Sequence, residues 1–355
     1  MFPVYPGSPD LNSLYQPLLT PAPLPREPSR RVLHISDLHM VERDNAEIVA
    51  DQLVTDTENI PELQKPHIVI ISGDITDRAG TYDAAKLFIK KLQHGLKLAT
   101  GLIIIVPGNH DYSRDISKQA HDAETGSSDT ATIKDSRAVW ERFKFFSEFY
   151  HSIRGETYHL DPREQGMLYV LEEHKLVILG LNSAHSLDHV NTTRAGINAV
   201  AVSRAIGKLR DDWINQNNDI KNWLKIAVWH HPVHGAGDDR ITDTQFLDQL
   251  SRAGFRLGLH GHVHKIDLFH YPHALAENRK FDILGAGSLS ASGRDLRSGY
   301  PFQYQMLHVP MPNERQIVRV HTRCREPDRG AFRRDYRWPA GTDVTLARSY
   351  HEILV

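Results

Sequence analysis

The chain has 355 residues, enough for one large domain or two ordinary ones, and its 40% hydrophobic and 24% charged residues are typical of a globular protein. A net charge of −2 excludes strong overall attraction to nucleic acid or anionic lipid, and the single cysteine, Cys324, excludes intrachain disulfides and thiolate metal sites. The sequence has neither an apolar run long enough for a membrane span nor a secretory signal, so we expect a cytoplasmic location.

Residues 1–31 are predicted to form a proline-rich N-terminal arm. Proline fixes φ and donates no backbone hydrogen bond, so a segment rich in proline is extended. The prolines of this segment are Pro3, Pro6, Pro9, Pro17, Pro21, Pro23, Pro25 and Pro28.

After this arm, and up to about residue 310, short apolar runs alternate with helical patterns. The runs are rich in β-branched residues and end in glycine or polar residues, which predicts buried strands over 31–36, 67–72, 102–107, 176–181, 225–230, 255–262 and 281–288. Helical patterns cover 43–57, 81–96, 136–153 and 201–216. This alternation predicts an α/β fold with buried sheets, whose ligands bind at the carboxyl ends of strands.

Residues 113–135 interrupt this pattern. The segment is polar and rich in Ser, Thr and Asp, and it directly follows the sequence "GNHD". We predict a long loop here, either covering a functional site or forming a surface insertion.

Polar residues recur where the predicted strands end. They include Asp37 and His39, Asp74 and Asp77, Asn109 and His110, His230 and His231, and His262 and His264. This set offers oxygen and imidazole ligands without sulfur, which suits Mn, Fe or Zn better than Ca or Mg. Two metal ions about 3.5–4 Å apart need such a set, with one bridging carboxylate.

The spacing within the motifs supports a shared site. In "DLH" (37–39) and "GHVH" (261–264), the two donors are alternate residues, and alternate side chains of an extended segment point the same way. Each motif can therefore present two ligands to one small volume. The adjacent glycines allow sharp turns and close approach of the backbone.

Five motifs in order resemble the calcineurin-like metallophosphoesterase family, from about residue 32 to 309. They are "DLH" (37–39), "GDITD" (73–77), "GNHD" (108–111), "HHP" (230–232) and "GHVH" (261–264). The resemblance implies a four-layer α/β/β/α sandwich forming a catalytic domain over 32–310, followed by a C-terminal extension over 311–355.

The resemblance also implies roles for individual residues. Asp37, His39 and His264 would bind one metal ion, Asp74 would bridge two ions, and Asn109, His230 and His262 would bind the second. Mn, or Fe together with Mn, is favoured over Zn. His110 would protonate the leaving oxygen or hold the phosphate, and Asp77, or else Asp111, would orient its ring.

Several neighbouring residues have a structural interpretation instead. His34 is expected to be packed and hydrogen-bonded within a strand. The motif "HHP" leaves a choice of ligand, and the resemblance favours His230 over His231, which would then support the ligands. His260 is expected to orient the ligands as a neighbour, with direct substrate contact as the alternative. Surface or local roles are favoured over substrate contact for Arg78, Asn182 and Ser183.

The stretch "TRCREPDRGAFRRDYRWP" (322–339) has six arginines interleaved with Phe332, Tyr336 and Trp338. Arginine with aromatic residues can grip phosphates and stack on bases. We favour the alternative, a solvated tail whose aromatic side chains pack on the domain.

The resemblance implies a dinuclear-metal-dependent phosphodiesterase in which a metal-bridging hydroxide attacks phosphorus. The expected substrate is a phosphate ester such as a cyclic nucleotide, another phosphodiester or a nucleic acid. A phosphomonoesterase and a DNA or RNA nuclease are the alternatives, and a non-catalytic scaffold is disfavoured because no ligand is missing. The sequence carries no signal for an oligomeric state.

Overall fold

The computed structural model describes residues 29–355, except 126–135, 236, 238, 272–279, 292–295, 297–298, 313, 327–329 and 341–342. Most of the predicted N-terminal arm lies outside the described residues. Its last two residues, Arg30 and Arg31, already belong to the first strand.

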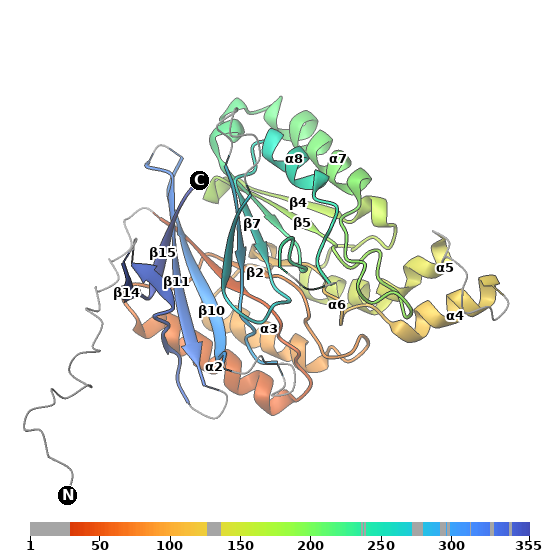
Figure 1. Ribbon diagram of the computed structural model, residues 1–355, viewed down its shortest axis with the longest axis horizontal. Helices are drawn as coiled ribbons and strands as arrows, with labels where there is room; N and C mark the ends of the chain where they lie inside the picture. Colours follow the sequence, from red (N-terminus) through yellow and green to blue (C-terminus); the bar gives the residue numbers. More distant parts are fainter. Residues whose placement is uncertain are drawn as a thin grey trace, which may run out of the picture.

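Two mixed sheets form the centre of the fold (Figure 1). The first has the order β12-β11-β10-β1-β2-β3, with β15 also paired to β11. Its strands are β1 (Arg30–Ile35), β2 (Ile68–Ile71), β3 (Ile103–Ile105), β10 (Phe302–Val309), β11 (Ile317–Arg325), β12 (Arg333–Arg334) and β15 (Tyr350–Leu354).

The second sheet has the order β4-β5-β6-β7-β9-β8. Its strands are β4 (Gly166–Leu171), β5 (Leu176–Leu181), β6 (Leu224–Val228), β7 (Leu257–His260), β8 (Asp267–Tyr271) and β9 (Phe281–Gly285). A separate ribbon pairs β13 (Trp338–Ala340) with β14 (Asp343–Arg348). All seven predicted strands are present, each within a few residues of the expected bounds.

The central strands of both sheets are buried on both faces, whereas the edge strands β4, β8 and β12 are partly or fully exposed. In β1, Leu33 and Ile35 pack with the helices, whereas Val32 packs between the sheets against residues such as Ile226 and Leu257. This alternation arises because successive side chains point to opposite faces of a strand. It explains the continuous β-branched runs, since a strand covered on both sides has no solvated face.

Helices cover the outer face of each sheet. The helices α2 (Arg43–Asn59), α3 (Asp83–Leu96) and α6 (Lys144–Arg154) share an apolar core with the first sheet. The helices α7 (Ala199–Lys208) and α8 (Gln245–Arg252) share another with the second sheet. The layers are therefore α/β/β/α, as predicted.

The predicted loop over 113–135 is wrong at its start, because Arg114–Thr125 form the helix α4. The buried side chains of α4 are small or polar, namely Ser117, Ala120 and His121. A helix that buries so little apolar surface gives no apolar periodicity in the sequence. The predicted helix over 136–153 is divided into α5 (Arg137–Trp140) and α6 by a 3₁₀ turn.

The C-terminal residues continue the first sheet rather than forming a solvated tail. Strand β11 pairs with β10 and β15, and Val318, Val320 and Ile353 are buried between the two sheets. Arg323 is buried and forms a bidentate ion pair with Asp56 of α2 at 2.6 and 2.8 Å. The interpretation of these arginines as solvated is therefore wrong for Arg323.

No helix among the described residues has both the length and the apolar character needed to cross a membrane.

Candidate metal centre

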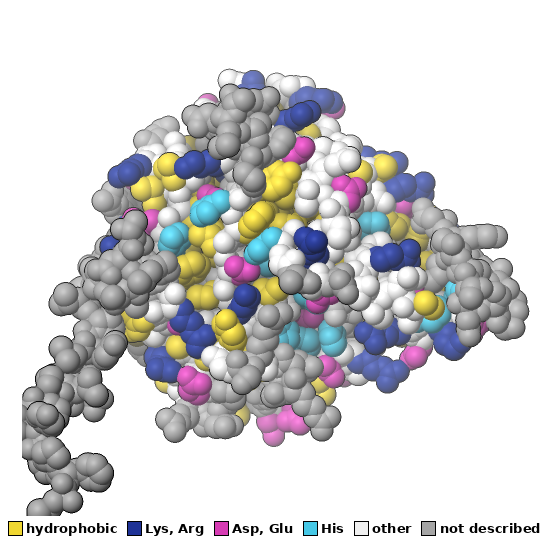
Figure 2. Space-filling view, in the orientation of Figure 1, with side chains coloured by type: hydrophobic (Ala, Val, Ile, Leu, Met, Phe, Trp, Pro, Cys, Tyr) yellow, Lys and Arg dark blue, Asp and Glu magenta, His cyan; other side chains and the backbone are white. Residues whose placement is uncertain are grey.

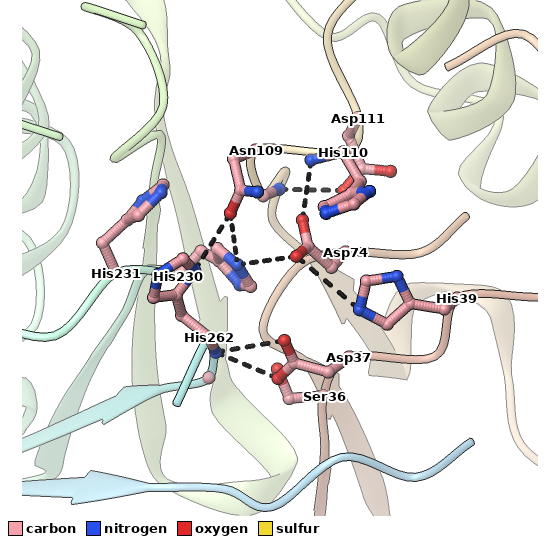
Figure 3. Close-up of polar contacts among 12 residues, drawn as sticks. Ser36, Asp37, His39, Asp74, Asn109, His110, Asp111, His230, His231 and His262 are labelled. Atoms are coloured by element: carbon pink, nitrogen blue, oxygen red, sulfur yellow. Dashed lines mark hydrogen bonds and ion pairs between the residues drawn. The ribbon is translucent and has the colours of Figure 1, made fainter. Parts of the chain in front are cut away.

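The predicted ligands lie together because each follows the carboxyl end of a strand (Figure 3). Asp37 and His39 follow β1, Asp74 follows β2 and Asn109 follows β3, whereas His230 follows β6, and His262 and His264 follow β7. Strands β1, β2 and β3 are parallel, as are β6 and β7. The structure thus brings all seven predicted ligands into one network of contacts.

The backbone is strained at this site. Eight described residues other than glycine have positive φ, and five of them are predicted ligands: Asp37, His39, Asp74, His262 and His264. Residues with a Cβ atom avoid this region, and each such conformation costs on the order of 1–3 kcal/mol when it persists at a functional site. The strained backbone therefore lowers the stability of the fold, but it orients these side chains toward one point.

Two glycines of the motifs allow the close approach that this arrangement requires. A Cβ atom on Gly108 would lie within 3.0 Å of Asp74, and one on Gly261 within 3.0 Å of Ser36 and Asp37. Any side chain at either position would displace a predicted ligand.

The first group of donors comprises Asp37, His39 and His264. His264 Nε2 lies 3.1 Å from Asp37 Oδ1, and the rings of His39 and His264 are 5.4 Å apart. The carboxylate of Asp37 also accepts hydrogen bonds from the backbone N–H of His262 at 3.0 and 3.2 Å. This bond ties the first group to the second.

The second group comprises Asp74, Asn109, His230 and His262. His230 Nε2 lies 3.1 Å from Asp74 Oδ2 and 3.2 Å from Asn109 Oδ1, and His262 Nδ1 lies 3.0 Å from Asn109 Oδ1. His230 Nδ1 donates a hydrogen bond to the carbonyl oxygen of Ser72 at 2.7 Å. This bond fixes the ring so that Nε2 faces the other donors.

The site concentrates negative charge that is removed from water. Burial alone would raise the pKa of Asp37, but the neighbouring His264 holds it below its ordinary value. Burial likewise opposes ionisation of Asp74, and His230 and His110 hold its pKa well below the ordinary value. Two ionised, buried carboxylates require positive charge beside them.

The donor set fits a pair of transition-metal ions. Four groups of three side chains place ligand atoms within 4.8 Å of one another, and Asp74 belongs to two of these groups. Both ring nitrogens of His39 are buried without a hydrogen-bond partner among the described residues, although Asp74 and Asp77 lie 3.8 Å away. Buried imidazole nitrogens are normally satisfied, and a metal ion would satisfy His39.

His110 lies beside the ligands and faces outward. Its Nδ1 donates to the carbonyl oxygen of Asp77 at 2.8 Å, whereas the Asp77 carboxylate is 3.8 Å away. Burial lowers the pKa of His110, but Asp74 and the Asp77 carbonyl outweigh it, and the pKa is raised. The Asp111 carboxylate instead accepts from the backbone N–H of Gly108 and Ile75, so Asp77 contacts the ring and Asp111 braces the loop.

Two of the remaining histidines are packed within the fold. His34 Nδ1 and Nε2 each lie 2.9 Å from a side-chain oxygen, on Gln305 and Ser72 respectively, and burial lowers its pKa to about 4. His260 is fully buried and contacts the carbonyl oxygen of Gly261 at 2.9 Å. This burial argues against direct substrate contact by His260.

His231 lies beside the second group, and its ligand atom is within 4.8 Å of those of His230 and His262. Its Nδ1 lies 2.8 Å from Ser183 Oγ, which also accepts from the backbone N–H of His230, and its ring is 4.7 Å from that of His262. Ser183 therefore has a local role in holding the "HHP" turn. Asn182 is likewise used locally, because its Nδ2 donates to Gln165 and its Oδ1 accepts from Ala184.

A polar pocket of about 340 Å³ adjoins His110 and Asn109. Arg78 and Arg114 line it, together with Asp77 and Asp115, and Arg78 forms an ion pair with Asp115 at 2.6 Å. Arg78 thus lines the pocket, although we predicted only a surface role for it.

Sequence reasoning missed one carboxylate at the site, that of Asp239. Its Oδ2 lies 2.6 Å from His262 Nε2. Asp239 belongs to the connection between β6 and α8 and to none of the five motifs, so only its proximity in sequence to "HHP" hinted at it.

The fold and the arrangement of the five motifs agree with a comparison of sequence families. A profile described as calcineurin-like phosphoesterase matches residues 30–266, more than half of the chain. The protein therefore belongs to the calcineurin-like phosphoesterase family.

Individual relatives are distant. The uncharacterized metallophosphoesterase-like protein YydB of Bacillus subtilis (strain 168) is 25% identical over 252 residues, covering 66% of this chain and 48% of YydB. Purple acid phosphatase PPD1 from yellow lupin (Lupinus luteus) seeds has a TM-score of 0.51 at 10% identity, covering 83% of this chain and 51% of that one. The chain thus spans about half the length of each, and the likeness to the lupin protein shows the fold alone.

A metallophosphoesterase from Sphaerobacter thermophilus has a TM-score of 0.34 at 10% identity, covering 79% of this chain and 84% of that chain.

Proposed function

We propose that this protein is a hydrolase of phosphate esters that uses two transition-metal ions, with phosphodiesters as its preferred substrates and the cytoplasm as its location. The observation that carries the proposal is the arrangement of two donor groups around Asp74, beside the outward-facing His110. Family membership supports the same activity.

The predicted ligands and His110 have separate roles in this proposal. Asp37, His39 and His264 would hold one ion, Asn109, His230 and His262 the other, and Asp74 would contact both. When bound, the ions supply Lewis-acid catalysis at the phosphate. His110 donates a proton to the departing alcohol oxygen, while the Asp77 carbonyl fixes the orientation of its ring.

The charge of the adjoining pocket favours diesters over monoesters. A diester carries one negative charge on its phosphate and a monoester about two at neutral pH, so sites for monoesters commonly add unpaired arginines. Here Arg78 and Arg114 are balanced by Asp77 and Asp115, which line the same pocket. Of the more distant arginines, Arg194 forms an ion pair with Asp188.

The nuclease alternative is not favoured by the surface. On the face of the molecule drawn in Figure 2, Lys and Arg side chains are spread among acidic and apolar ones. The described arginines of 322–339 have acceptors within the chain; for example, Arg334 pairs with Glu62 and Arg333 with Glu326. These arginines therefore have less charge to offer to a nucleic-acid backbone.

Protein purified without chelator, or reconstituted with excess Mn²⁺, should contain about two ions per chain, as a dinuclear centre requires. Elemental analysis after desalting measures the ratio. A single tightly held ion, with no second site under excess Mn²⁺, would show that the dinuclear centre is wrong.

With two Mn²⁺ bound at pH 7–8, kcat/KM for bis-p-nitrophenyl phosphate should exceed that for p-nitrophenyl phosphate, because the balanced pocket suits a singly charged phosphate. Cyclic AMP and single-stranded DNA complete the panel. A clear preference for the monoester at equal metal loading would move the protein to the phosphatases of the family, and a preference for DNA would move it to the nucleases.

A further inference from the structure

The ring of His262 is held at both nitrogens. Nδ1 lies 3.0 Å from Asn109 Oδ1, on the side of the other donors, and Nε2 lies 2.6 Å from Asp239 Oδ2, on the opposite side. The side chain of His262 is 15% exposed and that of Asp239 is 47% exposed. The carboxylate thus lies at the rim of the site and the imidazole within it.

The position of Asp239 is fixed by a buried anchor. Ile241, two residues further along the connection between β6 and α8, is fully buried in the core beneath α8. Its backbone N–H donates to the carbonyl oxygen of Pro232 at 2.8 Å, which closes the loop back onto the "HHP" turn. The segment that supplies His230 therefore also carries Asp239 to the far side of His262.

We propose that Asp239 is a positioning residue for His262, which holds the imidazole in the tautomer that presents the Nδ1 lone pair to a metal ion. A neutral imidazole has one N–H and one lone pair on its two ring nitrogens. A carboxylate that accepts a hydrogen bond from Nε2–H therefore leaves the lone pair at Nδ1. The negative charge of the carboxylate also strengthens the ligand. This inference rests on the proposed two-ion site.

His230 provides a comparison within the same donor group. Its remaining nitrogen, Nδ1, donates to the uncharged carbonyl oxygen of Ser72, not to a carboxylate. The two histidines assigned to the second ion are therefore oriented by different kinds of acceptor. Removal of Asp239 takes away one charge at the rim and leaves the buried Ser72 contact intact.

A second histidine–carboxylate pair offers a matched control. His234 Nε2 lies 2.8 Å from Asp267 Oδ2, with side-chain exposures of 21% and 26%. His234 belongs to the same connection as Asp239 but to none of the donor groups. Loss of Asp267 should disturb the surface to a similar extent without changing a ligand.

The test compares Mn²⁺ binding to the metal-free full chain by isothermal titration calorimetry for the wild type, Asp239→Ala, Asp239→Asn and Asp267→Ala. We expect Asp239→Ala to weaken one of two ions by about 10–100-fold, the usual effect of losing an outer contact of a ligand. Asp239→Asn should weaken it less, because the amide oxygen can still accept from Nε2. Asp267→Ala should bind both ions as the wild type does, and the Tm in chelator should not change for Asp239→Ala.

The outcomes separate this inference from the proposed function. Wild-type protein that binds fewer than two ions would contradict the two-ion site itself. If the wild type binds two ions and Asp239→Ala binds both equally well, the positioning role is wrong. It is also wrong if Asp267→Ala weakens binding to the same extent, or if Asp239→Ala lowers the Tm in chelator, because a positioning residue leaves the metal-free fold intact.

Discussion

Replacing Asp74 with asparagine should abolish measurable turnover and release metal from both donor groups. Asp74 is 2% exposed, its Oδ2 lies 3.1 Å from His230 Nε2, and its carboxylate lies within 4.8 Å of ligand atoms of both donor groups, namely those of Asp37, His39 and His230. Asparagine keeps the size of the side chain and an oxygen for the backbone N–H of His110, but it removes the charge that would be shared by two ions. The loss should exceed the roughly 10–100-fold effect of removing an outer contact.

Metal content and kcat measured on the same preparations check this prediction. Asp51→Asn is a suitable control, because Asp51 is exposed and pairs with Lys91 on the surface. An Asp74→Asn protein that still holds two ions per chain would show that Asp74 does not bridge them, even if its activity were low.

That the seven predicted ligands lie together could be predicted, because the motifs that contain them stand at strand ends. Runs such as "HIVIIS" (67–72) have the composition of a strand covered on both faces, and the polar residue that follows must lie at the edge of the sheet. Asp74 and His262 are nearly 190 positions apart in sequence, yet both follow parallel strands. Asp74 follows β2 of the first sheet and His262 follows β7 of the second, so it is the packing of the two sheets that brings them to one place.

The elements that were missed lack such local signals. Helix α4 buries Ser117, Ala120 and His121, so its sequence resembles a polar loop. Strand β11 alternates Val318 and Val320 with arginines, one of which, Arg323, is neutralised by Asp56, about 270 positions earlier. A partner so distant in sequence cannot be inferred from composition. The contact between Asp239 and His262 spans only 23 positions, but Asp239 belongs to none of the five motifs, so no local signal marked it.

The roles of Asn109 and His110 are the hardest to separate from geometry. Asn109 Oδ1 contacts both His230 and His262, which places it within the second donor group. The His110 ring also lies near the donors of His39 and Asp74, within the 4.8 Å that could hold an ion. The position of His110 at the pocket favours a proton-transfer role. Its side chain is 30% exposed, and its Nδ1 donates a hydrogen bond to the Asp77 carbonyl oxygen.

His110→Ala should therefore keep two ions per chain and lower kcat by about 10²-fold or more, the usual contribution of a general acid. The backbone N–H that donates to Asp74 is retained in this variant, so the site stays assembled. Asn109→Ala should instead bind the second ion more weakly.

The nature of the leaving group gives a second readout, because an acidic alcohol such as p-nitrophenol needs little help from a proton donor. The deficit of His110→Ala should be smaller with bis-p-nitrophenyl phosphate than with a dialkyl phosphodiester, whereas loss of a metal ion should impair both. His94→Ala, at an exposed histidine of α3, controls for the loss of an imidazole elsewhere. If His110→Ala loses metal as Asn109→Ala does, and its deficit is the same with both esters, His110 is a ligand and the proton donor must be sought among the other residues lining the pocket.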